Sequence, residues 1–113
     1  MSRAWTIRVG HQFEQDYVDV LRWTTKTFGE GQARTYVETI GLAIEALGEG
    51  PNILVAMDRD EIHTFIRTFH VARHGRAGRH FVVFRAAGSA IDVLRLLHDS
   101  MDLLRHLPAA NDR

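Results

Sequence analysis

The chain has 113 residues, which is enough for one domain, residues 1–113, that buries about two-thirds of its unfolded surface. Its composition, 45% hydrophobic and 25% charged, is that of an ordinary globular protein and predicts no long disordered tail. The absence of Cys excludes disulfides and thiolate metal sites, and no apolar run reaches the roughly 18 residues of a membrane helix, so we expect a cytoplasmic protein with no membrane partner.

The formal net charge is zero, but the charges are unevenly distributed along the chain. From His11 to Glu61 there are ten acidic and four basic residues, whereas Ile62–Ile91 contains five Arg and no acidic residue. Thirteen of the fourteen basic residues are Arg, whose planar guanidinium pairs with carboxylates and phosphates. The sequence therefore indicates a basic region that meets an anionic partner, although any single Arg is equally well explained as an ordinary surface residue.

The first half of the chain predicts one strand and two helices. Trp5, Ile7 and Val9 alternate with polar residues, which favours a short half-buried strand. In 12–27 and again in 31–47, apolar residues recur every three or four positions, as is typical of amphipathic helices. Because so few residues separate the two patterns, we expect the helices to form an antiparallel hairpin against one face of a sheet.

The second half predicts three further strands. Residues 64–71 alternate in character, residues 79–85 are β-branched and aromatic, and residues 91–98 are apolar on both faces, as an inner strand is. The last two runs flank the small residues 87–90 and are therefore expected to form a β-hairpin. Residues 52–62 have no clear pattern and fit either a short strand or a packed loop.

The predicted fold class is α+β, with the order β-α-α-β-β-β, an antiparallel sheet packed on a two-helix hairpin, and a short C-terminal tail from Ser100 to Leu107. We expect the helices to cover one face of the sheet and to leave the other face partly open as a binding surface. The tail is interpreted as a cover for the sheet edge. Trp23 and Tyr36 are interpreted as residues of the core or of the seam between the helices.

The C-terminal part of the chain resembles a known family. The run IDVLRLLH and the short clusters after it are similar to the C-terminal signature of ParE toxins, in the RelE/ParE superfamily of bacterial toxin-antitoxin modules. The residues that carry this resemblance are Ile91–His98, Met101, Asp102, Arg105, His106 and Leu107, together with Trp23, Phe28, Gly29, Gln32, Ala33, Tyr36, Pro51 and Arg67 upstream. The resemblance implies the RelE/ParE-like fold over most of the chain.

The resemblance also implies a function: a toxin that inhibits DNA gyrase by protein-protein binding in a type II module of the plasmid-stabilization kind, with no cofactor. It implies a cognate antitoxin that binds operator DNA through its N-terminal half and folds its C-terminal segment onto the toxin. The residues expected to contact the target or the antitoxin are Arg67, Arg73, Arg76, Arg79, Arg95, His98, Met101 and Asp102. Arg95 is equally explained by a structural ion pair with Asp92 or Asp102.

A ribosome-dependent mRNA endonuclease of the RelE type is the alternative function. In that case Arg67, Arg85 and Arg95 would stabilise charge on the scissile phosphate, and His98 would transfer protons. The neighbouring Asp99 argues against this function, because its carboxylate would repel a phosphate. A binding module without toxic activity is a third interpretation.

We expect neither a metal nor a nucleotide cofactor. His70, His74 and His80 fall on a predicted strand, a turn and the next strand, so they lack the helical spacing of a metal-binding pair. Gly75 and Gly78 lie in a turn between strands and do not open a helix, as a phosphate-binding loop does.

Overall fold

The structure is a computed structural model that describes residues 5–50, 57–58, 66–72 and 75–100. Within these residues the chain forms two α-helices, one 3-10 turn and a five-stranded sheet. The predicted α+β class, with a helical hairpin before the later strands, is confirmed. Arg73, Met101 and Asp102 lie outside the described residues, as does the predicted tail beyond Ser100.

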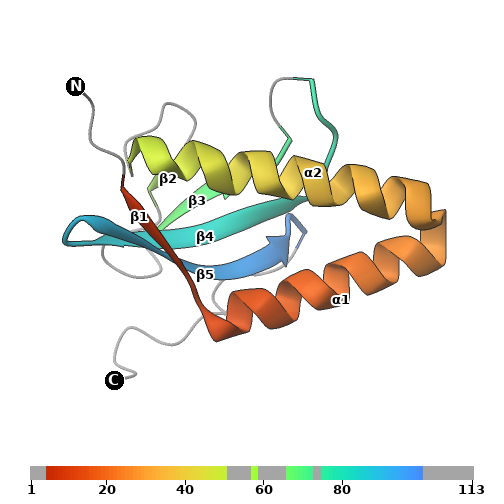
Figure 1. Ribbon diagram of the computed structural model, residues 1–113, viewed down its shortest axis with the longest axis horizontal. Coiled ribbons are helices and arrows are strands. Elements are labelled where there is room, and N and C mark those ends of the chain that lie inside the picture. The colour runs from red at the N-terminus through yellow and green to blue at the C-terminus, as the bar shows by residue number, and fades with distance from the viewer. Residues whose placement is uncertain (1–4, 51–56, 59–65, 73–74, 101–113) are drawn as a thin grey trace.

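The two helices run antiparallel and are joined through a single residue (Figure 1). They are α1 (His11–Phe28) and α2 (Glu30–Ala46), and the 3-10 turn η1 (Leu47–Glu49) follows α2. Gly29 makes the reversal possible because its φ of 95° is readily adopted only by glycine. In the described part of the chain, neither helix is long and apolar enough to cross a membrane.

The strands lie in the order β1-β5-β4-β3-β2 across one sheet. Their bounds are β1 (Thr6–Val9), β2 (Met57–Asp58), β3 (Ile66–His70), β4 (His80–Ala87) and β5 (Ala90–His98). The sheet is mixed, because β1 pairs with β5 in parallel while the other pairs are antiparallel. The expectation of a fully antiparallel sheet was therefore wrong for β1, since alternation of side chains predicts a strand but not its direction.

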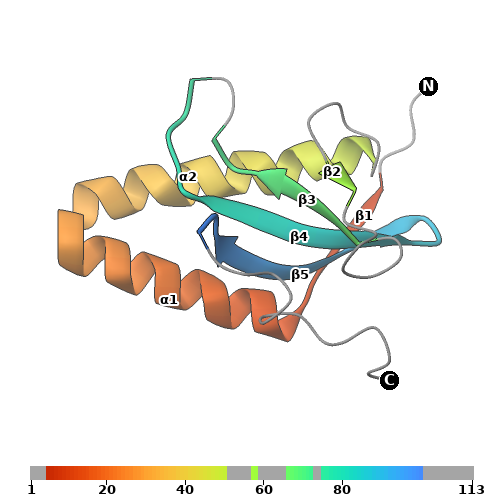
Figure 2. The same ribbon diagram turned by 180° about the vertical axis from the view of Figure 1, so that it is seen from behind.

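Both helices pack on the same face of the sheet, and Figure 2 shows the other face turned toward the viewer. The core between helices and sheet consists of apolar side chains that are almost fully buried. Its buried members are Phe13, Ile40, Ala43, Leu47, Phe69, Val71, Val82, Phe84, Ile91, Val93 and Leu96. The helical periodicity of α1 and α2 thus places their apolar stripes against alternate residues of β3, β4 and β5.

The second face of the sheet, which we expected to be partly open as a binding surface, buries its central apolar residues. A second cluster of apolar residues lies there, formed by Ile66, Phe81, Val83 and Leu97. All four are buried, with exposed fractions between 0% and 8%. Although neither α1 nor α2 covers this face, these four apolar side chains are not accessible to a partner, and Leu94 beside them is only partly buried.

Asp16 of α1 anchors the helical hairpin to the sheet. Strand β1 pairs with β5 only as far as Val93, and beyond that point the Asp16 carboxylate takes the place of a neighbouring strand. It accepts hydrogen bonds from the Leu96 backbone N–H (3.0 Å) and from the Arg95 Nε and Nη2 atoms (2.7 and 3.0 Å). Arg95 thus pairs with a residue 79 positions away, whereas Asp92, one of its two expected partners, pairs with Arg8. The other expected partner, Asp102, lies outside the described residues.

We expect Asp16→Asn to lower the free energy of unfolding by roughly 3 kcal/mol, because it removes the Asp16 charge from its ion pair with the largely buried Arg95 guanidinium. Urea unfolding followed by circular dichroism measures the change. Asp19→Asn is the matched control, since Asp19 is an exposed carboxylate on the same helix and its removal should change stability by less than about 0.5 kcal/mol. Equal effects of the two substitutions would contradict the anchoring role of Asp16.

Candidate functional site

A pocket of about 630 Å³ opens between the closed end of the helical hairpin and the loop that leads into β4. Residues from four parts of the chain line it: the end of α1, the part of α2 from Gln32 to Thr39, the segment 75–80, and the end of β5. Its aromatic and basic lining residues include Trp23, Phe28, Tyr36, Arg76, Arg79 and His98. The pocket therefore joins aromatic side chains from the helices to basic side chains from the sheet end.

The loop on one side of the pocket is fastened to α2. The Arg76 guanidinium donates hydrogen bonds to the Thr39 hydroxyl (3.0 Å) and the Thr35 carbonyl (3.1 Å), and it forms an ion pair with Glu38 at 3.0 Å. Gly78 is required at the closest approach, because a Cβ there would lie 2.6 Å from Val71 and 3.0 Å from the Tyr36 ring. The predicted site residue Arg76 therefore has a structural partner set of its own.

Tyr36, which is half-buried, and His80, which is buried, form a polar pair at the base of the pocket. The Tyr36 hydroxyl oxygen accepts the backbone N–H of Arg79 at 3.1 Å and lies 2.7 Å from His80 Nδ1, so its O–H donates to that nitrogen. Burial lowers the pKa of His80 to about 4, with a further contribution from the nearby His98 imidazole. Burial also raises the pKa of Tyr36. At neutral pH both groups are uncharged, and the imidazole proton is assigned to Nε2.

Asp99, just after β5, connects three strand ends. Its carboxylate accepts hydrogen bonds from His70 Nε2 at 3.1 Å and from Arg79 Nε at 3.3 Å, while its backbone N–H donates to the Arg79 carbonyl at 2.8 Å. These bonds, that of His70 first, lower the pKa of Asp99 to about 2. Asp99 therefore stays ionised and compensates the charge of Arg79, which is otherwise 70% exposed.

His98 lies at the inner edge of the pocket beside His80. Cross-strand pairing sets the two residues opposite each other on β4 and β5, and their rings meet edge to face at 5.2 Å. Ser100 supplies both its backbone N–H (3.1 Å) and its hydroxyl (2.8 Å) to His98 Nδ1. The His98 side chain is 35% exposed and so is accessible from the pocket.

The aromatic wall of the pocket is exposed. Trp23 and Phe28 meet edge to face with ring centroids 5.7 Å apart, and they are 57% and 59% exposed. The interpretation of Trp23 as a core or seam residue was therefore wrong, because α1 extends past the sheet and its last turns have no strand to pack on. Tyr36 is half-buried, packs against the core and also contributes its hydroxyl to the site.

The structure brings together only part of the predicted site. Arg76, Arg79 and His98 line the pocket, whereas Arg95 is bound to Asp16 and is largely buried. Arg67 lies on β3 opposite Phe84, and Arg85 pairs with Asp92 near the other end of β5. His98 is six residues from Asp92 along that strand, about 20 Å at 3.3 Å per residue. The four residues of the endonuclease interpretation thus do not converge on one point.

Sequence reasoning missed Phe28, His70, His80 and Asp99 as members of the site. Phe28 was noted only as one of the residues that carry the family resemblance, with no role assigned to it. The Tyr36–His80 hydrogen bond joins residues 44 positions apart, which no local sequence pattern reveals. Within the described residues, no group of three His, Asp or Glu side chains is arranged to hold a metal ion.

Comparisons with known proteins identify similar chains. The family described as "ParE toxin of type II toxin-antitoxin system, parDE" matches residues 7–103. A curated Toxin ParE from Escherichia coli is 32% identical over 97 residues, which cover 83% of this chain and 84% of that protein. A solved structure titled "Chromosomal ParDE TA system from P. aeruginosa" has the same fold, with a TM-score of 0.70 and 18% identity over 86% of this chain and 98% of that one.

We expect His80 to make stability depend on pH below neutrality. The unfolded His takes up a proton near pH 6.5 and the folded one only near pH 4, so stability falls as the pH is lowered between these values, by up to about 1.4 kcal/mol per pH unit. Urea unfolding at several pH values and an NMR titration of the His80 ring measure this. His80→Asn, which keeps an acceptor for the Tyr36 hydroxyl, should remove this part of the slope; a His80 ring that titrates near 6.5 would contradict the assignment.

Proposed function

The chain belongs to the ParE family of toxins of type II toxin-antitoxin systems, and we propose that it acts by binding and inhibiting DNA gyrase through the pocket at the end of its helical hairpin. The target follows from the family resemblance, and the place of contact follows from the chemistry of this surface. We also propose that the toxin works in the cytoplasm without a cofactor.

The observation that supports this contact surface is the exposure of two large aromatic side chains beside basic ones. Trp23 and Phe28 are each more than half exposed, and Arg79 lies across the pocket from them. Trp, Tyr and Arg are the residues that most often dominate the free energy of protein-protein binding, especially where they surround a pocket. Aromatic rings left in water are otherwise unfavourable, so their position suits a surface that becomes buried against another protein.

The charges at the pocket favour protein binding over phosphate chemistry. A site that cleaves RNA needs cations free to stabilise the phosphate as its charge develops. Here the guanidinium of Arg76 is bound to Glu38 and that of Arg79 to Asp99, and Asp99 stays ionised. Arg85 lies on β4 opposite Asp92, six residues along β5 from His98, and this separation likewise disfavours the endonuclease interpretation.

We further propose that a cognate antitoxin neutralises the toxin by covering the same pocket with a C-terminal segment that folds on binding. Acidic side chains of that segment would pair with Arg79, the most exposed Arg of the pocket for which an ion pair is described, and apolar ones would pack on Trp23 and Phe28. Operator DNA would be bound by the antitoxin and so contacted only indirectly by the toxin.

We expect Trp23→Ala and Phe28→Ala each to raise the concentration needed for half-inhibition of gyrase supercoiling by roughly 30-fold, the effect of losing a central aromatic contact. Leu42→Ala is the matched control, because Leu42 is an apolar residue of similar exposure, 46%, on α2 but outside the pocket. It should leave inhibition unchanged. Circular dichroism of each variant checks that the fold is retained.

The contrary outcomes are equally specific. Inhibition that is unaffected by both aromatic substitutions would place the gyrase contact elsewhere on the toxin. Cleavage of ribosome-bound mRNA by the purified protein, abolished by His98→Ala, would replace the gyrase proposal with the endonuclease function. Addition of the antitoxin, expected to be encoded beside the toxin, should restore supercoiling if it covers the pocket.

A further inference from the structure

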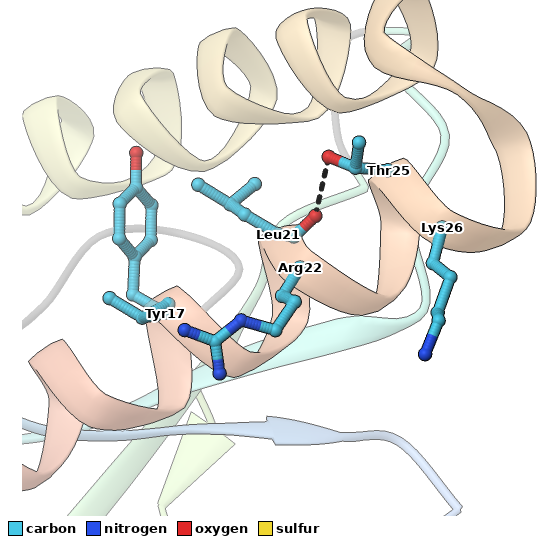
Figure 3. Close-up of a pocket in the computed structure, with 6 residues that line it drawn as sticks. Tyr17, Leu21, Arg22, Thr25 and Lys26 are labelled. Atoms are coloured by element: carbon cyan, nitrogen blue, oxygen red, sulfur yellow. Dashed lines mark hydrogen bonds between the residues drawn. The ribbon is translucent and has the colours of Figure 1, made fainter.

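The face of α1 that points away from the sheet carries a shallow hollow of about 660 Å³, separate from the pocket at the end of the hairpin. Figure 3 shows that Tyr17 and Leu21 lean toward α2, whereas Lys26 points away from it. Most of the residues around the hollow are exposed, so it lies on the solvent side of α1. Its lining consists of Tyr17, Val18, Leu21, Arg22, Thr25 and Lys26. Its apolar floor is thus bordered by two cations.

A second hollow of about 370 Å³ continues the first toward the start of α1. Its lining consists of His11, Glu14, Gln15, Val18, Asp19 and Arg22, so the two hollows share Val18 and Arg22. The start of this outer face therefore carries acidic side chains, its end carries basic ones, and Val18, which is 48% exposed, lies near the middle. In the described part of the chain, neither Glu14 nor Lys26 forms an ion pair.

We propose that this outer face of α1 binds the same face of a second copy of the chain, with the two helices antiparallel. The spacing is symmetric about position 20: Glu14 and Lys26 lie six residues to either side of it, and Val18 and Arg22 lie two residues to either side. Turning a second helix end for end therefore sets each Glu14 against Lys26 of the other copy. The two ion pairs would be about 18 Å apart, since an α-helix rises 1.5 Å per residue.

Charge complementarity favours a second copy over a different partner. An acidic segment of another protein would be attracted by Arg22 and Lys26 but repelled by Glu14 and Asp19 in the adjoining hollow. A basic segment would be attracted by the two acidic residues but repelled by the two basic ones. A helix face with acidic residues at one end and basic residues at the other is complementary to a second copy of itself that runs in the opposite direction. Such self-complementarity is what a two-fold symmetric interface requires. The contact is small and mostly polar, so the dimer is weak and depends on concentration and salt.

This association goes beyond the proposed gyrase inhibition and does not depend on it. The exposed residues of this outer face, such as Val18 and Arg22, lie on the opposite side of α1 from the buried Phe13 and Thr24. Tyr17, at the edge of the hollow, packs against the core instead. The pocket bounded by Trp23 and Phe28 shares no lining residue with either hollow. The dimer therefore leaves one target-binding pocket open on each copy.

Sedimentation equilibrium of the full-length protein, from about 1 µM to 1 mM and at low and high salt, tests the proposal. We expect a monomer-dimer equilibrium that weakens as salt is raised. Glu14→Lys gives a face that is basic at both ends and Lys26→Glu one that is acidic at both ends, so each variant alone should dimerise at least about tenfold more weakly. An equimolar mixture of the two variants should recover the dimer, because the basic face of one meets the acidic face of the other.

Glu45→Lys is the control, since it reverses an exposed charge on α2 outside both hollows and should leave the dissociation constant unchanged. Both tested positions are exposed on α1, and circular dichroism of each variant verifies folding. A protein that stays monomeric up to 1 mM overturns the proposal. So does a dimer that is insensitive to both substitutions, or a mixture of variants that remains monomeric; binding of an added acidic or basic peptide to this face without self-association would assign it to a different partner.

Discussion

The contact on which the rest of the structure depends is the one between Asp16 and the exposed edge of β5. Strand β1 is too short to cover that edge, and the Asp16 carboxylate completes it by binding the Leu96 N–H and the Arg95 side chain. This fixes the direction of α1 relative to the sheet. Because α1 is longer than the part of the sheet it covers, the same contact determines where Trp23 and Phe28 emerge and hence where the pocket forms.

Much of the fold was predictable from the sequence because its signals are local. The apolar spacing of α1 and α2 placed both helices within a residue or two of their observed bounds, and the short separation of the two patterns predicted the reversal. The β-hairpin of β4 and β5 followed from two apolar runs around a small turn. The family resemblance was confirmed as well. The parallel pairing of β1 was not predictable, since strand direction depends on how the whole chain returns to β5.

The site was less predictable because its contacts join distant positions. An ion pair was expected for Arg95, yet the described one is with the distant Asp16. Arg79 and Asp99 meet only after two strands pair. Trp23 shows the opposite limit: as an aromatic residue of an amphipathic helix it was expected in the core or the seam, but nothing in the sequence says where the sheet ends. Periodicity reports which residues share a face, and only tertiary structure reports whether that face has a neighbour.

The tight approach of the loop to α2 at Gly78 restricts how this protein can diverge. Any side chain at this position would displace Tyr36, and with it the hydroxyl that holds the Arg79 backbone and His80. Gly75, with a φ of 80°, is restricted for a conformational reason instead. Between these two glycines, substitutions during evolution are therefore best tolerated at Ala77, which is exposed. A change at Ala77 can alter which partner binds without disturbing the residues that shape the pocket.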